Sequence, residues 1–297
     1  MRSTILSFTS LIIASALFGQ TTPPVKPPAQ NTVPNTGQRV PDNLRSPADP
    51  NIPTIWLVGD STVRNGAADG ANGQWGWGEP LAAYFDPAQV NLVNRAMGGL
   101  SSRTYLTGGN WERVIALAQP GDFILMQFGH NDAGPVNDNS RARGTLPGIG
   151  AETQSIDNML TRKPEVVQTY GWYLRRFITD AKAKKVTPIV CSPVPRKNWK
   201  DGSIQREQNT YAGWAKSIAA AEGVPFIDLN EMIAKRYEQL GPQKVEPLFA
   251  DEHTHTSRAG AELNAQAVVL GLNSLPGKPL VSHLSQKGKQ LITEGWK

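Results

Sequence analysis

The sequence predicts an α/β fold in which helices cover both faces of a parallel sheet. From residue 53 onward, short apolar runs typical of strands alternate with longer amphipathic runs typical of helices. Parallel strands need such helical crossovers, and these crossovers are almost always right-handed. Several strand-like runs also end abruptly in glycine and polar residues, and ligands in such folds bind beyond the carboxyl ends of the strands.

Five apolar runs are the expected strands, and these are residues 54–59, 90–95, 122–129, 187–192 and 224–228. The expected helices are residues 78–85, 111–118, 164–185, 205–221 and 229–240, with another after Ser257. The helix at 164–185 is predicted from a first-turn proline, apolar residues at helical spacing and two lysines in its last turn. Residues 130–163 are rich in Gly, Asn and Arg and predict a long loop, which is typical of a functional segment.

The first 20 residues predict a secretory signal peptide. Arg2 gives a positively charged start, and the apolar run over 5–18 is too short to span a membrane. The mature protein is therefore expected to be secreted or periplasmic, with no membrane attachment once the signal is removed. A short membrane anchor is the alternative.

Residues 21–50 predict an extended linker, because eight prolines and few large aliphatic residues cannot offset the entropy of ordering the chain. The α/β domain is expected over 51–273, and the tail 274–297 has no role assigned from sequence. Cys191 is the only cysteine, so an internal disulfide is excluded and the domain depends on a packed core.

The charge balance argues against a nucleic-acid-binding protein. The formal net charge is +5, and the basic residues form no block longer than a pair. A weak preference for acidic substrates is compatible with this charge.

Polar residues follow the predicted strands at four places. Ser61 follows the first strand, Gly98 and Gly99 follow the second, Asn131 follows the third, and His255 precedes the last helix. Because the carboxyl ends of parallel strands meet at one edge of the sheet, these residues are expected to form one site.

These residue types suit acyl transfer. A serine hydroxyl is a weak nucleophile that needs a nearby base, and His255 can be that base when a carboxylate orients its ring. The backbone N–H groups of Ser61 and of Gly99 or Gly98, together with the amide of Asn131, can stabilise an oxyanion, each donor typically contributing about 3 kcal/mol. A metal site at His253 and His255 is the alternative, although further ligands are hard to find.

The chain resembles the SGNH, or GDSL-like, hydrolase superfamily, and within it the rhamnogalacturonan acetylesterase branch. The resemblance covers residues 53–272 and places Ser61, Gly99, Asn131 and His255 in the four conserved blocks of that family. It rests on the stretches GDSTV, GWGEPL, NRAMGGLSSRTY, QFGHND, YGWYLRRFI and HTHTSRAGAE.

The resemblance implies a flavodoxin-like three-layer α/β/α sandwich with a central five-stranded parallel sheet. It also implies a serine mechanism without metal or cofactor, and removal of O-acetyl groups from plant cell-wall polysaccharide, with rhamnogalacturonan favoured. Acetylated polysaccharides or oligosaccharides are then the expected partners. A lipid esterase or thioesterase and a non-catalytic carbohydrate-binding relative are the alternatives.

The acid of the triad is ambiguous. The family usually places an aspartate three residues before the catalytic histidine, and this chain has Glu252 there and Asp251 one position earlier. The register favours Glu252, with Asp251 as the alternative.

Substrate contacts are harder to assign. Arg103, Trp77 and His253 are the candidates, although Trp77 can instead pack in the core and Arg103 can instead anchor a loop. The arginines that can meet uronate carboxylates, or lie as solvated surface charge, are Arg141, Arg143 and Arg196.

Overall fold

The computed structural model describes residues 46–65, 70 and 72–296. The predicted signal peptide and most of the predicted linker lie outside these residues. Within the described part of the chain, no helix is both long and apolar enough to cross a membrane.

The central sheet has five parallel strands in the order β2-β1-β3-β6-β9, which confirms the predicted fold class. The strands are β1 (Thr54–Gly59), β2 (Asn91–Asn94), β3 (Phe123–Gln127), β6 (Thr187–Cys191) and β9 (Phe226–Ile227). All six residues of β1 are buried, because neighbours pair with it on both edges and helices cover both faces.

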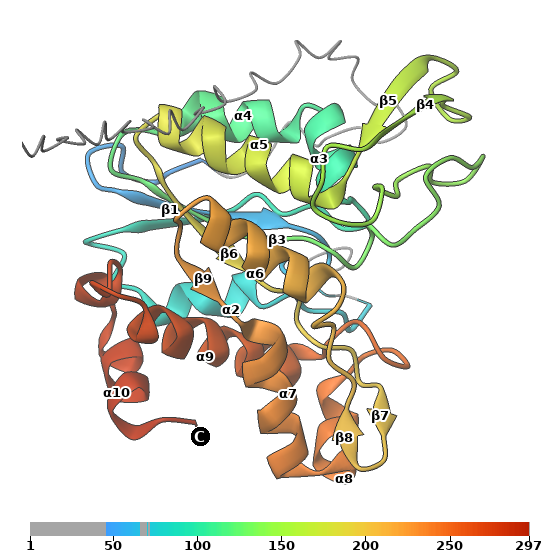
Figure 1. The fold of residues 1–297 in the computed structure, drawn as a ribbon. Helices are drawn as coiled ribbons and strands as arrows, with labels where there is room; N and C mark the ends of the chain where they lie inside the picture. Colours follow the sequence, from blue (N-terminus) through green and yellow to red (C-terminus); the bar gives the residue numbers. More distant parts are fainter. Residues whose placement is uncertain (1–45, 66–69, 71, 297) are drawn as a thin grey trace, which may run out of the picture. The chain divides into compact units, whose positions relative to one another are not determined.

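Helices form a layer on each side of the sheet (Figure 1). One layer holds α3 (Ser102–Thr107), α4 (Asn110–Leu117), α5 (Tyr170–Ala183) and α6 (Tyr211–Ala221). The other holds α2 (Gly78–Leu81), α7 (Leu229–Leu240), α9 (Arg258–Ser274) and α10 (Gln286–Glu294). Residues of β1 alternate between the layers: Trp56 packs with the first and Leu57 with the second.

Six shorter elements lie in the connections between these helices and strands. They are η1 (Ala82–Tyr84), β7 (Trp199–Lys200), β8 (Ser203–Ile204), α8 (Pro242–Val245), η2 (Glu246–Leu248) and η3 (Val281–His283).

The segment between β3 and α5 differs from the prediction. It contains an antiparallel hairpin, β4 (Thr153–Asp157) with β5 (Pro164–Gln168), so Pro164 begins a strand and not a helix. Helix α5 starts at Tyr170, where the Thr169 side chain accepts the N–H of Trp172 as a cap. The apolar residues at helical spacing do belong to a helix from Tyr170 onward, but the predicted helix starts six residues too early.

The C-terminal tail is part of the core. Leu280, Leu284 and Leu291 are buried in the same cluster as β1 and α9. The domain therefore continues past the expected boundary at residue 273, because α10 covers apolar surface of η1 and α9.

The strand order places the site. The chain passes from β1 to β2 on one side of it, and then from β2 across to β3 on the other side. In such folds a crevice lies between the carboxyl ends of the two strands at which the direction of winding changes, here β1 and β3. Ser61 follows the first of these ends and Asn131 follows the second.

Candidate active site

A tight turn after β1 presents Ser61. A Cβ added at Gly59 would lie 2.6 Å from the carbonyl oxygen of Gln127 and 2.6 Å from Val63 Cγ2, so the strand end requires glycine. The N–H of Val63 then donates to the carbonyl of Asp60 at 3.2 Å, which closes a turn around the serine.

The Ser61 hydroxyl lies within hydrogen-bonding distance of the His255 ring. Ser61 Oγ is 2.9 Å from His255 Nε2, and Asp251 Oδ2 is 2.5 Å from His255 Nδ1. A carboxylate only accepts, so Nδ1 carries the proton and Nε2 is left free to accept the serine proton. The three side chains thus have the geometry of a nucleophile, base and orienting acid.

Asp251, and not Glu252, contacts the histidine, so the preference for Glu252 is wrong. Asp251 Oδ1 accepts the N–H groups of Thr254 and His255 at 2.7 and 2.9 Å, and this tight turn aims Oδ2 at the ring. Glu252 is exposed. Partial burial raises the pKa of Asp251, but the hydrogen bonds from the His255 ring and the two N–H groups outweigh burial and lower it below its usual range.

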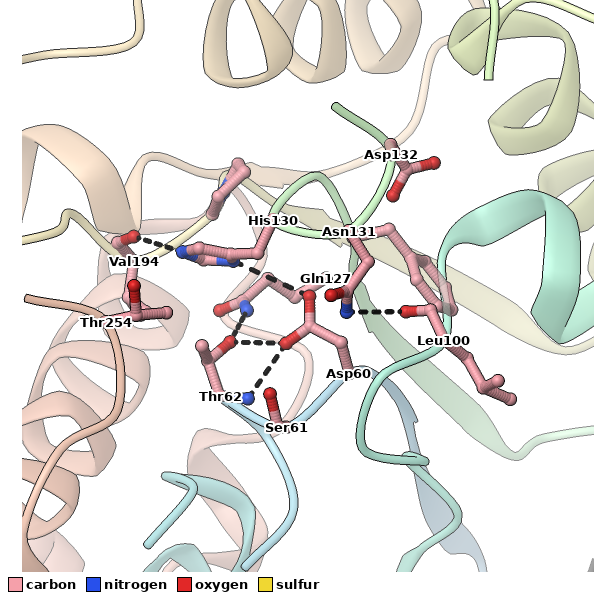
Figure 2. Close-up of polar contacts among 12 residues, drawn as sticks. Asp60, Ser61, Thr62, Leu100, Gln127, His130, Asn131, Asp132, Val194 and Thr254 are labelled. Carbon is pink, nitrogen blue, oxygen red and sulfur yellow. Dashed lines mark hydrogen bonds and ion pairs between the residues drawn. The ribbon is translucent and has the colours of Figure 1, made fainter. Parts of the chain in front are cut away.

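The predicted oxyanion donors lie beside Ser61 in one cleft. Gly99 adopts φ +79°, which glycine favours, and its carbonyl accepts Nη1 of Arg143 at 2.8 Å. Asn131 Nδ2 donates one N–H to the carbonyl of Leu100 at 2.9 Å (Figure 2). Among the described residues no partner is recorded for its second N–H, and Gly99, Asn131 and Ser61 all line the cleft.

A buried carboxylate joins the loops that follow β2 and β3. Asp132 is fully buried and accepts both the N–H and the hydroxyl of Ser102. Burial raises the pKa of Asp132 to about 7, although the Ser102 hydrogen bonds oppose this shift. Ser101 Oγ adds a bond to the carbonyl of Arg143 at 2.6 Å. These contacts hold Gly99 and Asn131, one on each loop, in a fixed relation.

His130 is a second histidine at the site, and its role was not foreseen from sequence. Its ring lies against Asp60 and the carbonyl of Val194 (Figure 2), and it lines the cleft. Asp60 Oδ1 also accepts the N–H and hydroxyl of Thr62, each at 2.8 Å. The available sequence signal is its position beside Asn131, three residues after the end of β3.

Arg103 and Trp77 are structural, so the prediction that they contact substrate is wrong. Both side chains are fully buried. The Arg103 guanidinium forms a two-pronged ion pair with Glu165, at 2.7 and 2.8 Å, and donates to the carbonyl of Gly144. Trp77 Nε1 donates to Gln127 at 2.8 Å. Arg103 thereby fastens the 130–163 segment, the alternative considered for it.

His253 is exposed and lies outside the set of cleft-lining residues. Its Nδ1 is 2.5 Å from the hydroxyl of Thr254, and its carbonyl accepts the N–H of Lys197. In the described part of the chain, no cluster of three or more His, Cys, Asp or Glu side chains has the arrangement of a metal site.

The cleft over Ser61 has a volume of about 640 Å³, within the usual range for small-ligand sites. Its walls come from the loops after β2 and β3, the 130–163 segment and the segment before α9. The residues discussed below that line it are Ser61, Gly99, His130, Asn131, Arg141, Arg143, Arg196, Thr254 and His255.

Curated relatives are similar over most of the chain. A rhamnogalacturonan acetylesterase of Emericella nidulans is 32% identical over 214 residues, which is 72% of this chain and 82% of that protein. A probable rhamnogalacturonan acetylesterase, YesY, of Bacillus subtilis is 31% identical over 235 residues, covering 77% and 96% of the two chains.

Among solved structures, that of protein YxiM of Bacillus subtilis is similar, with a TM-score of 0.60 and 26% identity. The match covers 75% of this chain and 56% of that one. Residues 57–263, which include Ser61, Gly99, Asn131 and His255, match the GDSL-like lipase/acylhydrolase family. The chain belongs to the GDSL-like lipase/acylhydrolase family and is an esterase of that family by fold, by sequence and by the arrangement of its serine, histidine and aspartate.

Proposed function

We propose that the protein is a carbohydrate O-acetylesterase that removes acetyl groups from plant cell-wall polysaccharide, with acetylated rhamnogalacturonan as the favoured substrate. The observation that carries the reaction type is the continuous line Ser61 Oγ–His255 Nε2 at 2.9 Å and His255 Nδ1–Asp251 Oδ2 at 2.5 Å. The substrate is supported by the two relatives named as rhamnogalacturonan acetylesterases.

In the first half of the reaction, Ser61 Oγ attacks the acetyl carbonyl and His255 Nε2 takes the serine proton. Negative charge then develops on the former carbonyl oxygen. The N–H groups of Ser61 and Gly99 and the amide of Asn131 stabilise it. As the C–O bond to the sugar breaks, His255 returns the proton to the sugar oxygen, leaving acetyl-Ser61 and a free sugar hydroxyl.

In the second half, water replaces the sugar. His255 Nε2 takes a proton from the water, whose oxygen attacks the acetyl-Ser61 carbonyl, and the same donors stabilise the oxyanion. The proton then returns to Ser61 Oγ as acetate leaves. Asp251 stays ionised throughout and stabilises the imidazolium that forms twice in the cycle.

The proposed place of action is outside the cytoplasm, secreted or periplasmic. The proposal depends on the signal-like sequence of residues 1–20. Expression of the full chain, followed by N-terminal sequencing of the protein outside the cytoplasm, tests it; an intact N-terminus on cytoplasmic protein contradicts it.

Acetate release tests the function. Acetylated rhamnogalacturonan, acetylated xylan and p-nitrophenyl acetate are compared with wild type and Ser61→Ala, and acyl chain length is varied in a p-nitrophenyl ester series. We expect turnover of rhamnogalacturonan and short acyl esters, loss of turnover in Ser61→Ala, and covalent labelling of wild type by a fluorophosphonate.

Two results would contradict the proposal. Undiminished turnover by Ser61→Ala would exclude the serine mechanism. A preference for long acyl chains with no acetate released from polysaccharide would instead favour a lipid esterase on the same fold.

A further inference from the structure

The charged side chains that line the cleft over Ser61 are basic. Among the described residues, those that line it include Arg141, Arg143 and Arg196, but no aspartate or glutamate. Asp60 and Asp251, which lie beside the catalytic groups, contact His130 and His255 respectively. A cleft with this charge attracts anionic ligands more strongly than neutral ones.

Two of the three arginines already have partners. Arg196 Nη1 forms an ion pair with Glu207 at 3.2 Å, and its Nε is 3.4 Å from the Thr254 hydroxyl. Arg143 Nη1 donates to the carbonyl of Gly99 at 2.8 Å. We therefore infer that Arg196 and Arg143 mainly stabilise the loops that line the cleft.

Arg141 is different. Its side chain is exposed, and within the described part of the chain its guanidinium forms no ion pair with a carboxylate. Its guanidinium N–H groups can therefore donate hydrogen bonds to the carboxylate of a bound ligand. Two charged side chains lie close to it: Arg143, whose pKa is lowered chiefly by burial and also by Arg141, and Asp138, which accepts the backbone N–H of Arg141.

The backbone beneath Arg141 is fixed. Asp138 Oδ1 accepts the N–H groups of Ser140, Arg141 and Ala142 at 3.0, 2.6 and 2.8 Å. Ala142 is fully buried with φ +39°, a conformation that non-glycine residues rarely adopt unless the surrounding structure holds them. The turn thus holds Arg141 at the cleft and limits the backbone entropy lost when it binds a ligand.

We propose that Arg141 is a carboxylate-binding subsite, which holds a uronic acid residue of the substrate while its acetyl group lies at Ser61. The inference rests on the proposed function and deepens it, because it makes an acidic sugar the substrate that the cleft selects. A guanidinium fork matches a carboxylate in two parallel hydrogen bonds, which fixes the orientation of the sugar as well as its affinity.

Kinetics on a matched substrate pair test the subsite. Acetylated oligogalacturonide is compared with the same oligosaccharide after chemical reduction of its carboxyl groups, for wild type, Arg141→Gln and Arg113→Gln. Arg113 is an exposed arginine of α4 outside the cleft-lining set, so its variant controls for the loss of one positive charge.

We expect wild type and Arg113→Gln to show a KM roughly tenfold or more lower for the acidic substrate than for its reduced form, as a charged hydrogen-bonded pair requires. In Arg141→Gln the two KM values are expected to converge. Circular dichroism and the Tm establish that each variant is folded. Equal KM values for the two substrates in wild type, or a wild-type ratio in folded Arg141→Gln, would overturn the proposal.

Binding without catalysis separates this inference from the proposed function. Isothermal titration of Ser61→Ala and Ser61→Ala/Arg141→Gln with unacetylated oligogalacturonate measures the subsite alone. Affinity that falls about tenfold on loss of Arg141 and weakens with added salt supports the subsite, even if no acetate is released from any polysaccharide. Affinity equal in the two proteins overturns the subsite, even if the esterase activity stands.

Discussion

Nδ1 of His130 lies 3.5 Å from Oδ2 of Asp60, and both side chains are buried next to the nucleophile. His130 Nε2 is 3.0 Å from the carbonyl of Val194, and because a carbonyl only accepts, this nitrogen carries a proton. Burial lowers the pKa of His130, but the Asp60 carboxylate raises it above the usual value. The pKa of Asp60 is lowered, because His130 and Thr62 outweigh its burial. The His130 ring and the Asp60 carboxylate therefore form a buried pair beside the Ser61 turn.

This pair predicts a pH-dependent part of the stability. The raised pKa of His130 contributes stability that is fully present below about pH 6.5 and is lost as pH rises through the folded pKa. The lowered pKa of Asp60 contributes stability that is present above about pH 4 and is lost as pH falls through the folded pKa. The pair is therefore most stabilising in mildly acidic solution.

His130→Gln checks this expectation, since glutamine can still donate to Val194 but cannot carry charge. The Tm of wild type and variant is measured from about pH 4 to pH 9, a span that brackets the reference pKa values of both groups. We expect the Tm of His130→Gln to fall furthest below that of wild type at pH values between the reference pKa of aspartate and that of histidine. The difference in Tm should become smaller in alkaline solution. A loss that is constant over the whole range would show that the histidine is neutral in the fold.

Asp251→Asn is expected to lower kcat by roughly 10⁴-fold, because an amide at this position can stabilise the wrong tautomer of His255 and offers no charge to its imidazolium. Glu252→Gln is the matched control and is expected to keep nearly full activity, since Glu252 is exposed and lies apart from the ring contact. Initial rates on p-nitrophenyl acetate measure both. A larger loss in Glu252→Gln than in Asp251→Asn would mean that the glutamate moves to the histidine during turnover.

Asn131→Ala is expected to lower kcat by about 10² to 10³, equivalent to about 3–4 kcal/mol of lost oxyanion stabilisation, with little change in KM. Its amide also holds the carbonyl of Leu100 at 2.9 Å, so the Tm is recorded with the kinetics. Asn209→Ala, on an exposed turn, is the control. Full activity of Asn131→Ala would contradict the assignment of Asn131 to the oxyanion hole.

Arg143→Gln is expected to reduce kcat on p-nitrophenyl acetate by about tenfold, because a charge-assisted hydrogen bond of about 1.5–3 kcal/mol no longer holds the Gly99 carbonyl. A small neutral ester has no carboxylate to bind, so this readout reports the position of Gly99 and not electrostatic attraction of substrate. Unchanged kcat on this ester, with an altered KM for acidic sugars alone, would make Arg143 part of the binding surface instead.

The sheet and the serine–histidine pair were predictable because their signals are local and strong. The apolar, partly β-branched run of β1 is typical of a strand buried inside a parallel sheet, and its end fixes where Ser61 emerges. The position of Asn131 at the site was predictable in the same way, because it lies just after the carboxyl end of β3. Resemblance to the family added the order of the blocks and hence the pairing of Ser61 with His255.

The remaining features depend on contacts between distant segments. Arg103 looks like a surface cation in sequence, and its burial depends on partners far along the chain, above all on Glu165, 62 residues later. The β4–β5 hairpin has mostly exposed side chains, so the apolar alternation that reveals other strands is weak in it. The choice of Asp251 depends on turn geometry, which side-chain spacing alone does not contain, although aspartate readily accepts N–H groups two to four residues onward.

The Arg103–Glu165 clamp has a consequence for how a polymer is bound. The Arg103 guanidinium also donates to the carbonyls of Val136 and Gly144. The segment 130–163, which carries Arg141, is therefore attached to α3 at several points and is unsuited to act as a mobile lid. A wall held at several points is unlike a lid, so we expect the cleft to remain accessible from solvent without a closing movement. For the proposed polysaccharide substrate, this favours deacetylation at internal positions of the polymer, without the need to start from a chain end.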